Sequence, residues 1–284
     1  MNGRTLPVEM WLKLLLGIGF ALMLVCALVM PAPRPRSLLG TRDHGGATLR
    51  LMTWNVGYGD LESETRARVE DLPAIAQVIL NHDPDAVALQ ELTGKDQLNL
   101  LLKHLKHRYR GSVSSAGKAD RVAAVLVKDR YAKFNDVTAG DRFAAAVTFH
   151  LQPKLPEIVF VSAHADAFNA SRRRAFSADV VDWSRGRGKD ELAFVAGDFN
   201  LEVSVRNRSN LFTDDAKHDS ESYGYLLKYF RDLGREAGET SINDRRIDYV
   251  FGPPEAVTLR RAEVLRGTAI GRMDHWPLLV EVAL

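Results

Sequence analysis

Apolar and β-branched residues recur along residues 47–284 in short runs that turn-forming and charged segments separate. Runs of this length and composition are typical of β-strands. The pattern predicts nine strands, near Thr48–Trp54, Ala86–Leu89, Val122–Val127, Ala144–Phe149, Ile158–Ala163, Leu192–Ala196, Ile247–Phe251, Val257–Val264 and Leu278–Val282.

Helical periodicity or a capping residue marks four further segments: Leu72–Leu80, Gln97–His107, a segment from Ser171 towards Trp183, and Tyr223–Leu233. Pro73 suits the first turn of the first helix, and Ser171 is the predicted cap of the third. Residues 214–221, DDAKHDSE, are predicted to form an exposed loop.

The order of these elements predicts the fold class. Strands and helices alternate at first, but the middle of the chain places three strands in a row without a helix, which implies antiparallel neighbours. A purely parallel, doubly wound sheet is therefore disfavoured. We expect an α/β fold in which two mixed β-sheets pack together with helices outside them.

The amino-terminal segment has a different composition. Leu14 to Met30 are 17 consecutive uncharged residues, which is near the lower limit for a helix that crosses a membrane. Residues 1–30 are therefore predicted to be one transmembrane helix that anchors the protein, with a cleaved signal peptide as the alternative. Residues 31–46, rich in Pro, Arg and Gly, are the predicted linker. The domain at 47–284 is expected outside the cytoplasm, and secreted if the segment is cleaved.

Composition excludes several classes of protein. With 46% hydrophobic and 26% charged residues, the chain of 284 residues is neither disordered nor collagen-like nor a polytopic membrane protein. A single cysteine excludes an intramolecular disulfide framework. Residues 1–46 carry five of the 38 Lys and Arg but two of the 36 Asp and Glu. The remaining domain is close to neutral, so its charge gives no argument for binding nucleic acid.

Polar groups stand where several apolar runs end. Asn55, Glu91 and His164 each follow a predicted strand, where a side chain reaches a cleft and not the core. A carboxylate that leaves a buried strand needs a partner such as a metal ion or a base, because burying it alone is costly. Taken singly, each of the three also has an ordinary structural explanation.

The segment Ala196-Gly197-Asp198-Phe199-Asn200 carries a sharper signal. In an extended chain Asp198 and Asn200 project to one side, while Gly197 leaves room for another backbone or a ligand. An acid and an amide held side by side suit the orientation of one water and one phosphate oxygen.

An acid and an imidazole are predicted to pair near the carboxyl terminus. Asp248 leaves an apolar strand, and Asp274 and His275 come just before the last strand. A carboxylate beside an imidazole fixes its tautomer and raises its basicity, so Asp248 is predicted to orient His275, with Asp274 facing a metal. Oxygen ligands indicate Mg²⁺ or Mn²⁺, which would assist attack of water on a phosphate ester.

The ordered segments TWNV, LQEL, the strand ending in His164, GDFN, RIDYVFG and MDHWPL resemble the endonuclease/exonuclease/phosphatase superfamily, the relatives of pancreatic deoxyribonuclease. They cover nearly all of residues 48–284 in the family's order, and GDFN with the terminal DH-x-P is the most specific part. The resemblance implies a four-layer α/β sandwich and a Mg²⁺- or Mn²⁺-dependent phosphoric ester hydrolase. It implies the metal ligands Asn55, Glu91 and Asp274 and the catalytic residues His164, Asp198, Asn200, Asp248 and His275.

The same resemblance implies what each catalytic residue does. Asp198 orients or deprotonates the attacking water, and Asn200 holds a phosphate oxygen. His164 contacts the phosphate. His275, paired with Asp248, acts as a base or as a cationic stabiliser of the transition state.

Three positions depart from the family pattern. Met273 stands where many members have Ser, and Ala163 where Thr commonly precedes the His. Both positions affect hydrogen bonds around the site, so turnover is expected to be reduced. Thr93 follows LQEL where abasic-site endonucleases continue with Thr-Lys directly after the Glu, which weakens a DNA-repair assignment.

The substrate is the most open part of the prediction. Phosphodiester cleavage in nucleic acid is the leading expectation, although the basic clusters Lys103–Arg110 and Arg172–Arg174 are better explained as solvated helix faces. A lipid headgroup phosphodiester or phosphomonoester is the alternative, which the membrane segment supports. A non-catalytic binding module is disfavoured because the acid, amide and imidazole residues are intact. No protein partner is predicted.

Overall fold

The computed structural model describes residues 46–57, 69–115, 121–186, 191–203, 216–242, 244–268, 270–271 and 273–284. The chain divides after Arg42, and all described residues belong to the second unit, Asp43–Leu284. The predicted membrane helix at 1–30, and all of the predicted linker except its last residue, lie outside the described residues. Within the described ranges, no helix is both long enough and apolar enough to cross a membrane.

One six-stranded sheet is built on a parallel pair of strands, β1 (Thr48–Asn55) and β2 (Ala86–Leu92). The remaining strands join it antiparallel to their neighbours. The order is β11-β12-β1-β2-β4-β3, with β3 at Arg110–Val113, β4 at Val122–Val127, β11 at Thr258–Val264 and β12 at Leu278–Ala283.

The second six-stranded sheet repeats this plan on another parallel pair, β7 (Ile158–His164) and β8 (Leu192–Asp198). Its other strands are again antiparallel to their neighbours. The order is β5-β6-β7-β8-β10-β9, with β5 at Lys133–Ala139, β6 at Arg142–Phe149, β9 at Arg231–Asp232 and β10 at Asp248–Gly252.

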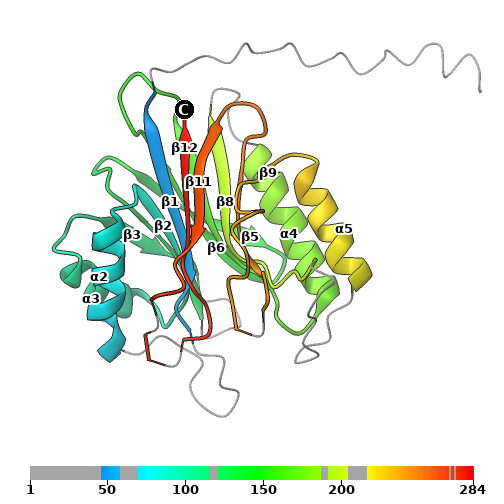
Figure 1. The fold of residues 1–284 in the computed structure, drawn as a ribbon, viewed down its shortest axis with the longest axis horizontal. Helices are drawn as coiled ribbons and strands as arrows, with labels where there is room; N and C mark the ends of the chain where they lie inside the picture. The colour runs from blue at the N-terminus through cyan, green and yellow to red at the C-terminus, as the bar shows by residue number, and fades with distance from the viewer. Residues whose placement is uncertain are drawn as a thin grey trace, which may run out of the picture. The chain divides into compact units, whose positions relative to one another are not determined.

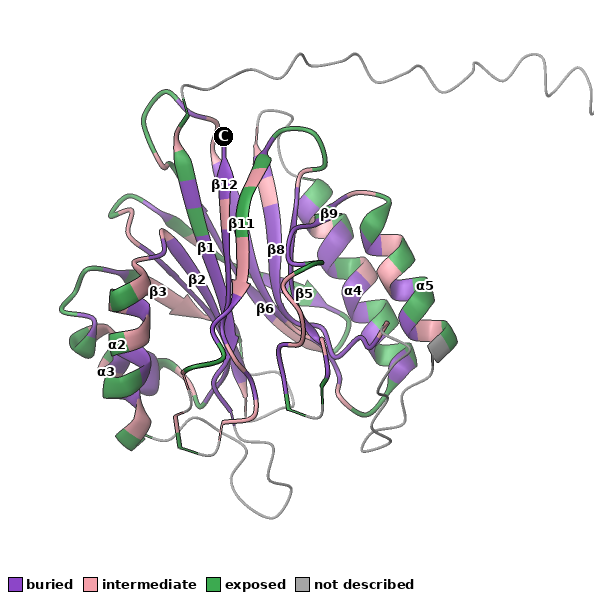
Figure 2. Ribbon diagram, viewed as in Figure 1, coloured by how far each residue is buried: buried purple, intermediate pink, exposed green. Residues whose placement is uncertain are grey.

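The two sheets pack face to face, and helices cover both outer faces (Figure 1). The short 3-10 helix Val69–Asp71 leads into α2 (Leu72–His82), which with α3 (Lys95–His104) covers the first sheet; α4 (Ala170–Arg185) and α5 (Ala216–Leu227) cover the second. Buried residues fill most of the strands inside the sheets, whereas exposed residues lie on parts of β1 and β11 and on the outward sides of the helices (Figure 2). This α/β sandwich with two mixed sheets confirms the predicted fold class.

Alternation along the strands determines which side chains point between the sheets. Leu49 and Leu51 of β1 contribute to the core between the sheets, and Asn55 continues the same face at the end of the strand. Phe160 of β7 and Phe194 of β8 also lie in this core. Four residues further along, His164 and Asp198 continue that face. The carboxyl ends of both parallel pairs therefore deliver polar side chains to the mouth between the two sheets.

All nine predicted strands are present, with ends within three residues of the prediction. The three successive middle strands are only partly as expected, because β6 and β7 are antiparallel neighbours but β4 belongs to the other sheet. Strands β3, β5 and β9 were not predicted. All three are edge strands, and their burial patterns are mixed or mostly exposed.

The helix predictions need three corrections. Of the loop predicted at 214–221, residues 216–221 are helical, because α5 begins at Ala216 and continues to Leu227, and residues 214 and 215 lie outside the described residues. The helix predicted at Tyr223–Leu233 is displaced, since β9 follows at Arg231. The cap of α4 is Asn169 and not Ser171, because the Asn169 side chain accepts from the backbone N–H of Arg172.

The sequence predicts that another backbone or a ligand closely approaches Gly197, and the structure shows such an approach. The φ of Gly197 is 143°, and a Cβ added there would lie 1.9 Å from the carbonyl oxygen of Ala163 on β7. The approaching group is therefore the neighbouring backbone. Because Gly197 directly precedes Asp198, this contact fixes how closely the ends of β7 and β8 bring their site residues together.

Candidate active site

Asn55 connects the two sheets at the mouth of the sandwich. Its Nδ2 donates to Oε1 of Glu91 at 3.2 Å and to Oδ2 of Asp198 at 3.0 Å. Its Oδ1 accepts from the backbone N–H of Gly57 at 2.9 Å, which fixes the orientation of the amide. A carbonyl oxygen has two lone pairs, so this atom can still contact a cation.

Glu91 reaches the site through an irregular turn of the backbone. The pairing of β2 with β4 shifts register between Leu89 and Leu92, and the φ of Glu91 is 66°. In a regular strand Glu91 would share the face of Leu89, which packs in the helix-covered core. The bulge turns Glu91 to the site instead, and such backbone strain is characteristic of functional positions.

The carboxylate of Glu91 is buried and only half satisfied. Oε1 accepts from Nη1 of Arg121 at 2.9 Å as well as from Asn55, but Oε2 has no hydrogen-bond partner among the described residues. Burial raises the pKa of Glu91 to about 7 although the charge of Arg121 opposes this. A buried carboxylate oxygen without a donor fits contact with a cation, which would favour the ionised form.

His164 lies between the carboxylates of the two sheets. Its Nε2 is 3.6 Å from Oε1 of Glu91 and 3.7 Å from Oδ2 of Asp198. Burial lowers the pKa of His164 to about 4, more than the charge of Asp198 raises it. The ring is therefore neutral near pH 7 and can donate one hydrogen bond.

Asn200 holds Asp198 and the following loop in place. Its backbone N–H donates to Oδ1 of Asp198 at 2.9 Å, and its Nδ2 donates to the carbonyl of Ala165 at 3.3 Å. The φ of Asn200 is 51°, a left-handed conformation that Asn tolerates better than most residues. The loops after β7 and β8 are thus tied together next to the site.

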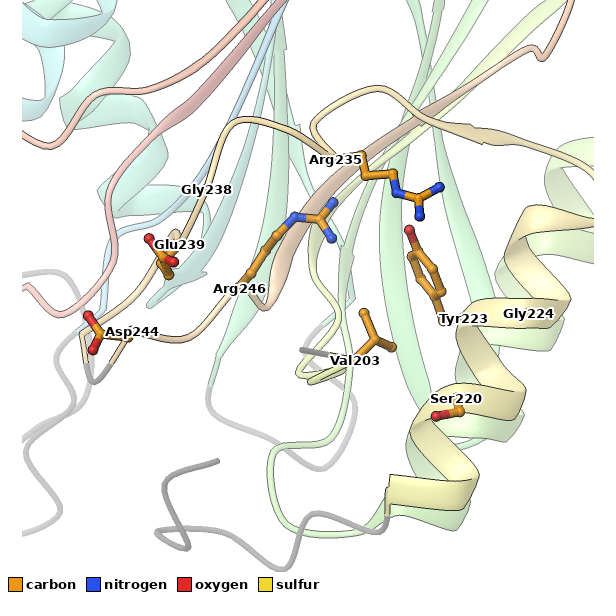
Figure 3. Close-up of a pocket in the computed structure, with 9 residues that line it drawn as sticks. All are labelled: Val203, Ser220, Tyr223, Gly224, Arg235, Gly238, Glu239, Asp244 and Arg246. Carbon is orange, nitrogen blue, oxygen red and sulfur yellow. The ribbon is translucent and has the colours of Figure 1, made fainter. Parts of the chain in front are cut away.

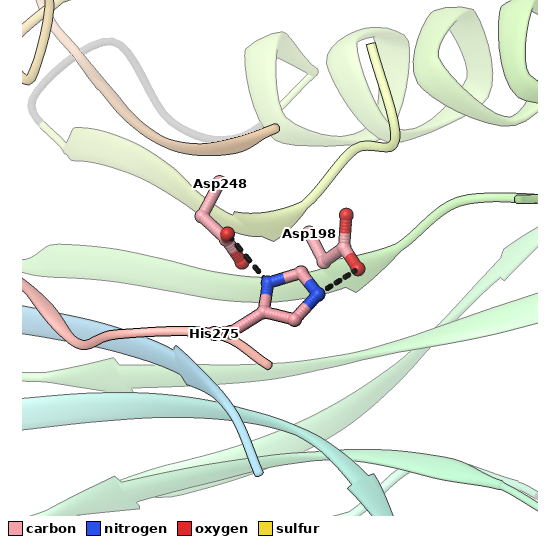
Figure 4. Close-up of side chains that lie close together, drawn as sticks. All are labelled: Asp198, Asp248 and His275. Carbon is pink, nitrogen blue, oxygen red and sulfur yellow. Dashed lines mark hydrogen bonds and ion pairs between the residues drawn. The ribbon is translucent and has the colours of Figure 1, made fainter. Parts of the chain in front are cut away.

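Asp248 lies beside His275, as the sequence predicts (Figure 4). Asp248 Oδ2 is 2.7 Å from Nδ1 of His275, and the other ring nitrogen, Nε2, is 3.8 Å from Asp198 and 3.9 Å from Asp274. Burial lowers the pKa of His275, but the charges of Asp248, Asp198 and Asp274 together raise it to about 10. Without a bound cation this arrangement favours the imidazolium form.

Backbone contacts hold this pair from both sides. Oγ1 of the buried Thr240 accepts from the backbone N–H of Asp248 at 3.1 Å, and its carbonyl accepts from the N–H of Trp276 at 2.8 Å. The indole N–H of Trp54 donates to the carbonyl of His275 at 3.2 Å. Thr240 therefore joins the segment that carries Asp248 to the segment that carries His275.

A second polar connection lies directly below the site. Gln90 of β2 donates to Oγ of Ser162 on β7 at 3.0 Å, and Ser162 donates to the carbonyl of Leu89 at 3.1 Å. All of these groups are buried. Since the two strands belong to different sheets, this network sets the spacing of the sheets where Glu91 and His164 emerge.

The charges at the site favour a divalent cation. Four carboxylates, those of Glu91, Asp198, Asp248 and Asp274, gather there, and burial raises the pKa of Asp274. Asp198, Asp248 and His275 also place one potential ligand atom each within 4.8 Å of one another. Asp248 Oδ2 already pairs with Nδ1 of His275, but Asp248 Oδ1, like Oε2 of Glu91, is buried and has no hydrogen-bond partner among the described residues. The oxygen donors around Glu91 fit Mg²⁺ or Mn²⁺.

Two arginines at the site were missed by the sequence analysis. Arg121 directly precedes β4 and binds Glu91, and Arg142 begins β6 and donates to Asp166 Oδ2 at 3.0 Å. Both charges act on His164. The start of a strand that is antiparallel to β2 or β7 lies at the same edge as the carboxyl ends of those strands. An arginine at the start of such a strand was therefore the sequence feature that could have identified both residues.

Of the two basic clusters that the sequence singled out, Lys103–Arg110 lies away from the site, and Arg172–Arg174 is exposed except at Arg173. Lys103–Arg110 spans the end of α3 and the start of β3, and Arg110 pairs with Val127 at the edge opposite the site. Arg173 is not on a solvated face, because it is fully buried in an ion pair with Asp219 at 2.9 Å. Met273, one of the departures from the family pattern, packs against the core under α2 and α3.

The loop after His164 is stabilised by a buried carboxylate, that of Asp166. It accepts from the backbone N–H groups of Phe168 at 2.8 Å and Asn169 at 3.0 Å and from Arg142. Burial alone would raise the pKa of Asp166, but these donors together hold it below its ordinary value of 3.8. The ionised carboxylate is therefore the form that stabilises the loop.

We expect Asp166→Asn to lower the free energy of unfolding at pH 7 by about 1 kcal/mol, since an amide replaces a charged acceptor. Because the pKa of Asp166 is lower in the folded than in the unfolded protein, its ionised carboxylate stabilises the fold at pH values above the unfolded-state pKa. This contribution is lost as the pH falls through the folded-state pKa. The difference between the variant and the wild type should thus shrink between pH 7 and pH 3. Urea unfolding at both pH values measures it, and an equal difference at both would contradict the assignment.

Comparison with solved structures finds the same fold in other proteins at low sequence identity. A mannosyl-6-phosphatase of Bacteroides thetaiotaomicron VPI-5482 is 20% identical with a TM-score of 0.63, covering 83% of this chain and 100% of that one. A humanized D. rerio TDP2 is 16% identical with a TM-score of 0.64, covering 83% and 98%. The human Nocturnin catalytic domain, with bound sulfate, is 20% identical with a TM-score of 0.60, covering 83% and 94%.

Comparison of the sequence with curated proteins finds no match. The sequence model described as the Endonuclease/Exonuclease/phosphatase family, in contrast, matches residues 52–271, most of the domain described above. That range contains Asn55, Glu91, His164, Asp198 and Asp248. The chain belongs to the Endonuclease/Exonuclease/phosphatase family.

Proposed function

We propose that this protein is a metal-dependent phosphoester hydrolase in which an activated water attacks phosphorus and displaces an alcohol. This proposal rests mainly on Oε2 of Glu91, which is buried and has no hydrogen-bond partner among the described residues. Asp198 and His275 converge at the same mouth between the sheets. A site with excess carboxylate charge, neutral His164 and two nearby arginines suits an anionic ester bound through a cation.

In this proposal Glu91 holds Mg²⁺ or Mn²⁺, with Asn55 and Asp274 beside it. When bound, the ion neutralises charge on the phosphate and makes phosphorus easier to attack. Arg121 keeps Glu91 in place through its hydrogen bond to Oε1. The second carboxylate oxygen of Glu91 remains available to the ion.

Asp198 orients the attacking water and accepts its proton. Its Oδ1 is held by the N–H of Asn200, while its Oδ2 faces His164 and His275. As the bond from the water oxygen to phosphorus forms, the ester bond breaks and its oxygen leaves with the bonding electrons and takes up a proton. Proton transfer by a positioned carboxylate contributes about 10²- to 10⁴-fold to such rates.

His164, Asn200 and His275 bind the phosphoryl oxygens in this proposal. The neutral His164 donates from Nε2, and the amide of Asn200 supplies a further donor. His275, held by Asp248 at Nδ1, presents Nε2 to the charge that develops in the transition state. Donors positioned in advance stabilise that charge without having to reorient.

For the bond that is cleaved, we propose a phosphodiester, first of all in nucleic acid. Arg121 and Arg142 near His164 support an anionic ester. Arg172, an exposed member of the Arg172–Arg174 cluster, is 3.9 Å from Asp166 in the loop after His164, whereas Lys103–Arg110 lies at the opposite edge of the first sheet. A lipid headgroup ester is the second candidate, supported by the apolar run Leu14–Met30 that would anchor the enzyme at a membrane, with its domain outside the cytoplasm.

We expect the purified protein to hydrolyse bis-p-nitrophenyl phosphate with Mg²⁺ or Mn²⁺, and EDTA to abolish this activity because the carboxylates alone repel the anionic ester. Release of p-nitrophenol, with and without EDTA and after the ion is restored, measures it. Activity that survives EDTA would contradict the metal dependence. No activity with any metal in folded protein would favour a binding module on the same scaffold.

A single panel separates the substrate classes. Supercoiled plasmid and single-stranded RNA represent nucleic acid, sphingomyelin and phosphoinositides represent lipids, and a hexose phosphate represents small monoesters. His275→Ala serves as the control for contaminating hydrolases in every assay. Preferential cleavage of the RNA or plasmid would support the first proposal, and preferential cleavage of a lipid the second.

A further inference from the structure

A second pocket lies between α5 and the segment that precedes β10 (Figure 3). It has a volume of about 500 Å³, within the range of about 300–1,000 Å³ that small-molecule sites occupy. Arg235 lies beside Tyr223 of α5 on one side of the pocket, Glu239 and Asp244 lie on the other, and Arg246 lies between them (Figure 3). None of these residues has a role in the proposed hydrolysis.

The pocket adjoins the catalytic pair through short covalent and hydrogen-bonded connections. Arg246 is two residues before Asp248, and Glu239 directly precedes Thr240. Thr240 accepts one hydrogen bond through Oγ1 from the N–H of Asp248 and one through its carbonyl from the N–H of Trp276, which follows His275. A molecule in this pocket thus lies beside the segments that carry Asp248 and His275.

The charges that line the pocket cancel. Arg246 pairs with Asp232, stacks over the ring of Tyr249 and still has a buried Nε without a hydrogen-bond partner among the described residues. Glu239 pairs with Arg266. Figure 3 shows the basic and acidic side chains separated, with Arg235 and Tyr223 on one side and Glu239 and Asp244 on the other.

This lining distinguishes between ligand chemistries. A phosphate only accepts hydrogen bonds and would be repelled by the carboxylates of Glu239 and Asp244. A hydroxyl both donates and accepts, so neighbouring hydroxyls can bond a guanidinium on one side and a carboxylate on the other. Ser220 adds a hydroxyl, and the phenol oxygen of Tyr223, whose O–H donates a hydrogen bond to Asp232 at 2.8 Å, can still accept one.

We infer that this pocket is a substrate subsite for a polyhydroxylated ring, the sugar part of the ester whose phosphate is cleaved at Asp198 and His275. The inference rests on the proposed function and deepens it by naming the substrate class. The ring can come from a sugar phosphate or from the ribose of a nucleotide, because both present neighbouring hydroxyls. The sugar determines which ester binds, and the catalytic groups act on its phosphate.

Gly224 offers a way to close the pocket without disturbing the fold. It lies inside α5, and a Cβ added to it meets nothing within 4 Å. A larger residue also favours the helix, since glycine is the least favourable helix residue after proline. Gly224→Leu fills the pocket, and Gly224→Ala fills it less. Ala175→Leu, which adds the same side chain at an exposed position of α4, is the matched control.

The first test compares the full-length variants on three esters: glucose 6-phosphate, the p-nitrophenyl ester of uridine 5′-monophosphate, and bis-p-nitrophenyl phosphate, which has no sugar. Relative to the sugar-free ester, we expect kcat/KM for at least one sugar ester to fall about tenfold in Gly224→Leu, less in Gly224→Ala, and by less than about twofold in Ala175→Leu. The affected ester identifies the source of the ring. Unchanged ratios for both sugar esters would overturn the inference while leaving the proposed hydrolysis intact.

The second test does not depend on catalysis. Saturation-transfer NMR with methyl glucoside and with uridine, neither of which carries a phosphate, detects weak binding to the full-length protein. Transfer to either ligand that disappears in Gly224→Leu and persists in Ala175→Leu would support the subsite even if no ester is hydrolysed. Transfer to neither ligand, or transfer that Gly224→Leu leaves unchanged, would overturn it.

Discussion

Alanine at Asp198 or at His275 is expected to lower kcat for bis-p-nitrophenyl phosphate by about 10²-fold or more. In the proposed mechanism, Asp198→Ala removes the group that accepts the proton of water, and His275→Ala removes the imidazole that Asp248 holds at 2.7 Å. Initial rates at saturating substrate and Mg²⁺ measure both effects. Because Asp198 and His275 lie 3.8 Å apart and are proposed to act on the same reacting group, the double variant should lose much less than the product of the two single losses.

His104→Ala is the matched control for these rates. His104 is an exposed histidine in the last turn of α3, outside the proposed site, so its variant should retain the wild-type kcat. Circular dichroism shows whether each variant is folded. Rates near that of the wild type in both Asp198→Ala and His275→Ala would remove the proposed mechanism.

Arg173→Met is expected to lower the free energy of unfolding by about 3–5 kcal/mol. The guanidinium and the carboxylate of Asp219 are both fully buried and 2.9 Å apart, so the variant leaves an uncompensated buried charge. Arg173 also donates to the carbonyls of Asp166 and Ala167, and Asp219 accepts from the N–H of Glu202. Activity should fall as well, since these groups belong to the loops after His164 and Asn200. Urea unfolding measures the stability.

Two further variants separate the charge effect from the loss of packing. Arg173→Met combined with Asp219→Leu removes both charges, so it should recover much of the stability that the single variant loses. Arg172→Met replaces a neighbouring arginine whose side chain is 62% exposed, and its effect should stay within about 0.5 kcal/mol. A single variant as stable as the wild type would contradict the structural role of this ion pair.

The fold could be predicted wherever burial produced a regular pattern. The strands at the centres of the two sheets are buried on both faces, and their continuous apolar runs identified them. Strand β5, KFNDVTA, lies at an edge and exposes most of its residues, so no such run marks it. Strand β9 consists of two residues and is too short for any periodicity.

The error at α5 has a different physical cause. The segment DDAKHDSE is rich in charge, and charge predicts an exposed loop only when the charges meet water. In the structure Asp219 is buried because Arg173, distant in sequence, neutralises it. Arg173 was misinterpreted for the same reason, as part of a solvated basic face. A buried ion pair across two helices leaves no local signal in either segment.

The candidate site could be predicted because its residues stand at strand ends. Parallel pairing brings the ends of β1 and β2, and those of β7 and β8, to one edge, so Asn55, Glu91, His164 and Asp198 converge. The bulge that turns Glu91 was not predictable from alternation. Arg121 was missed because it precedes a strand, and only the antiparallel pairing of β4 with β2 brings it to the same edge.

We propose that one divalent cation binds at Glu91 and that the other site residues are arranged around it. The most direct measurement is a crystal structure of the protein soaked with Mn²⁺, with the ion located by its anomalous scattering and the Glu91→Gln variant treated identically. We predict one strong peak in contact with Oε2 of Glu91, close to Asn55 and Asp274, that disappears in the variant. A peak held instead by Asp198, Asp248 and His275, or no peak at the mouth between the sheets, would contradict the claim.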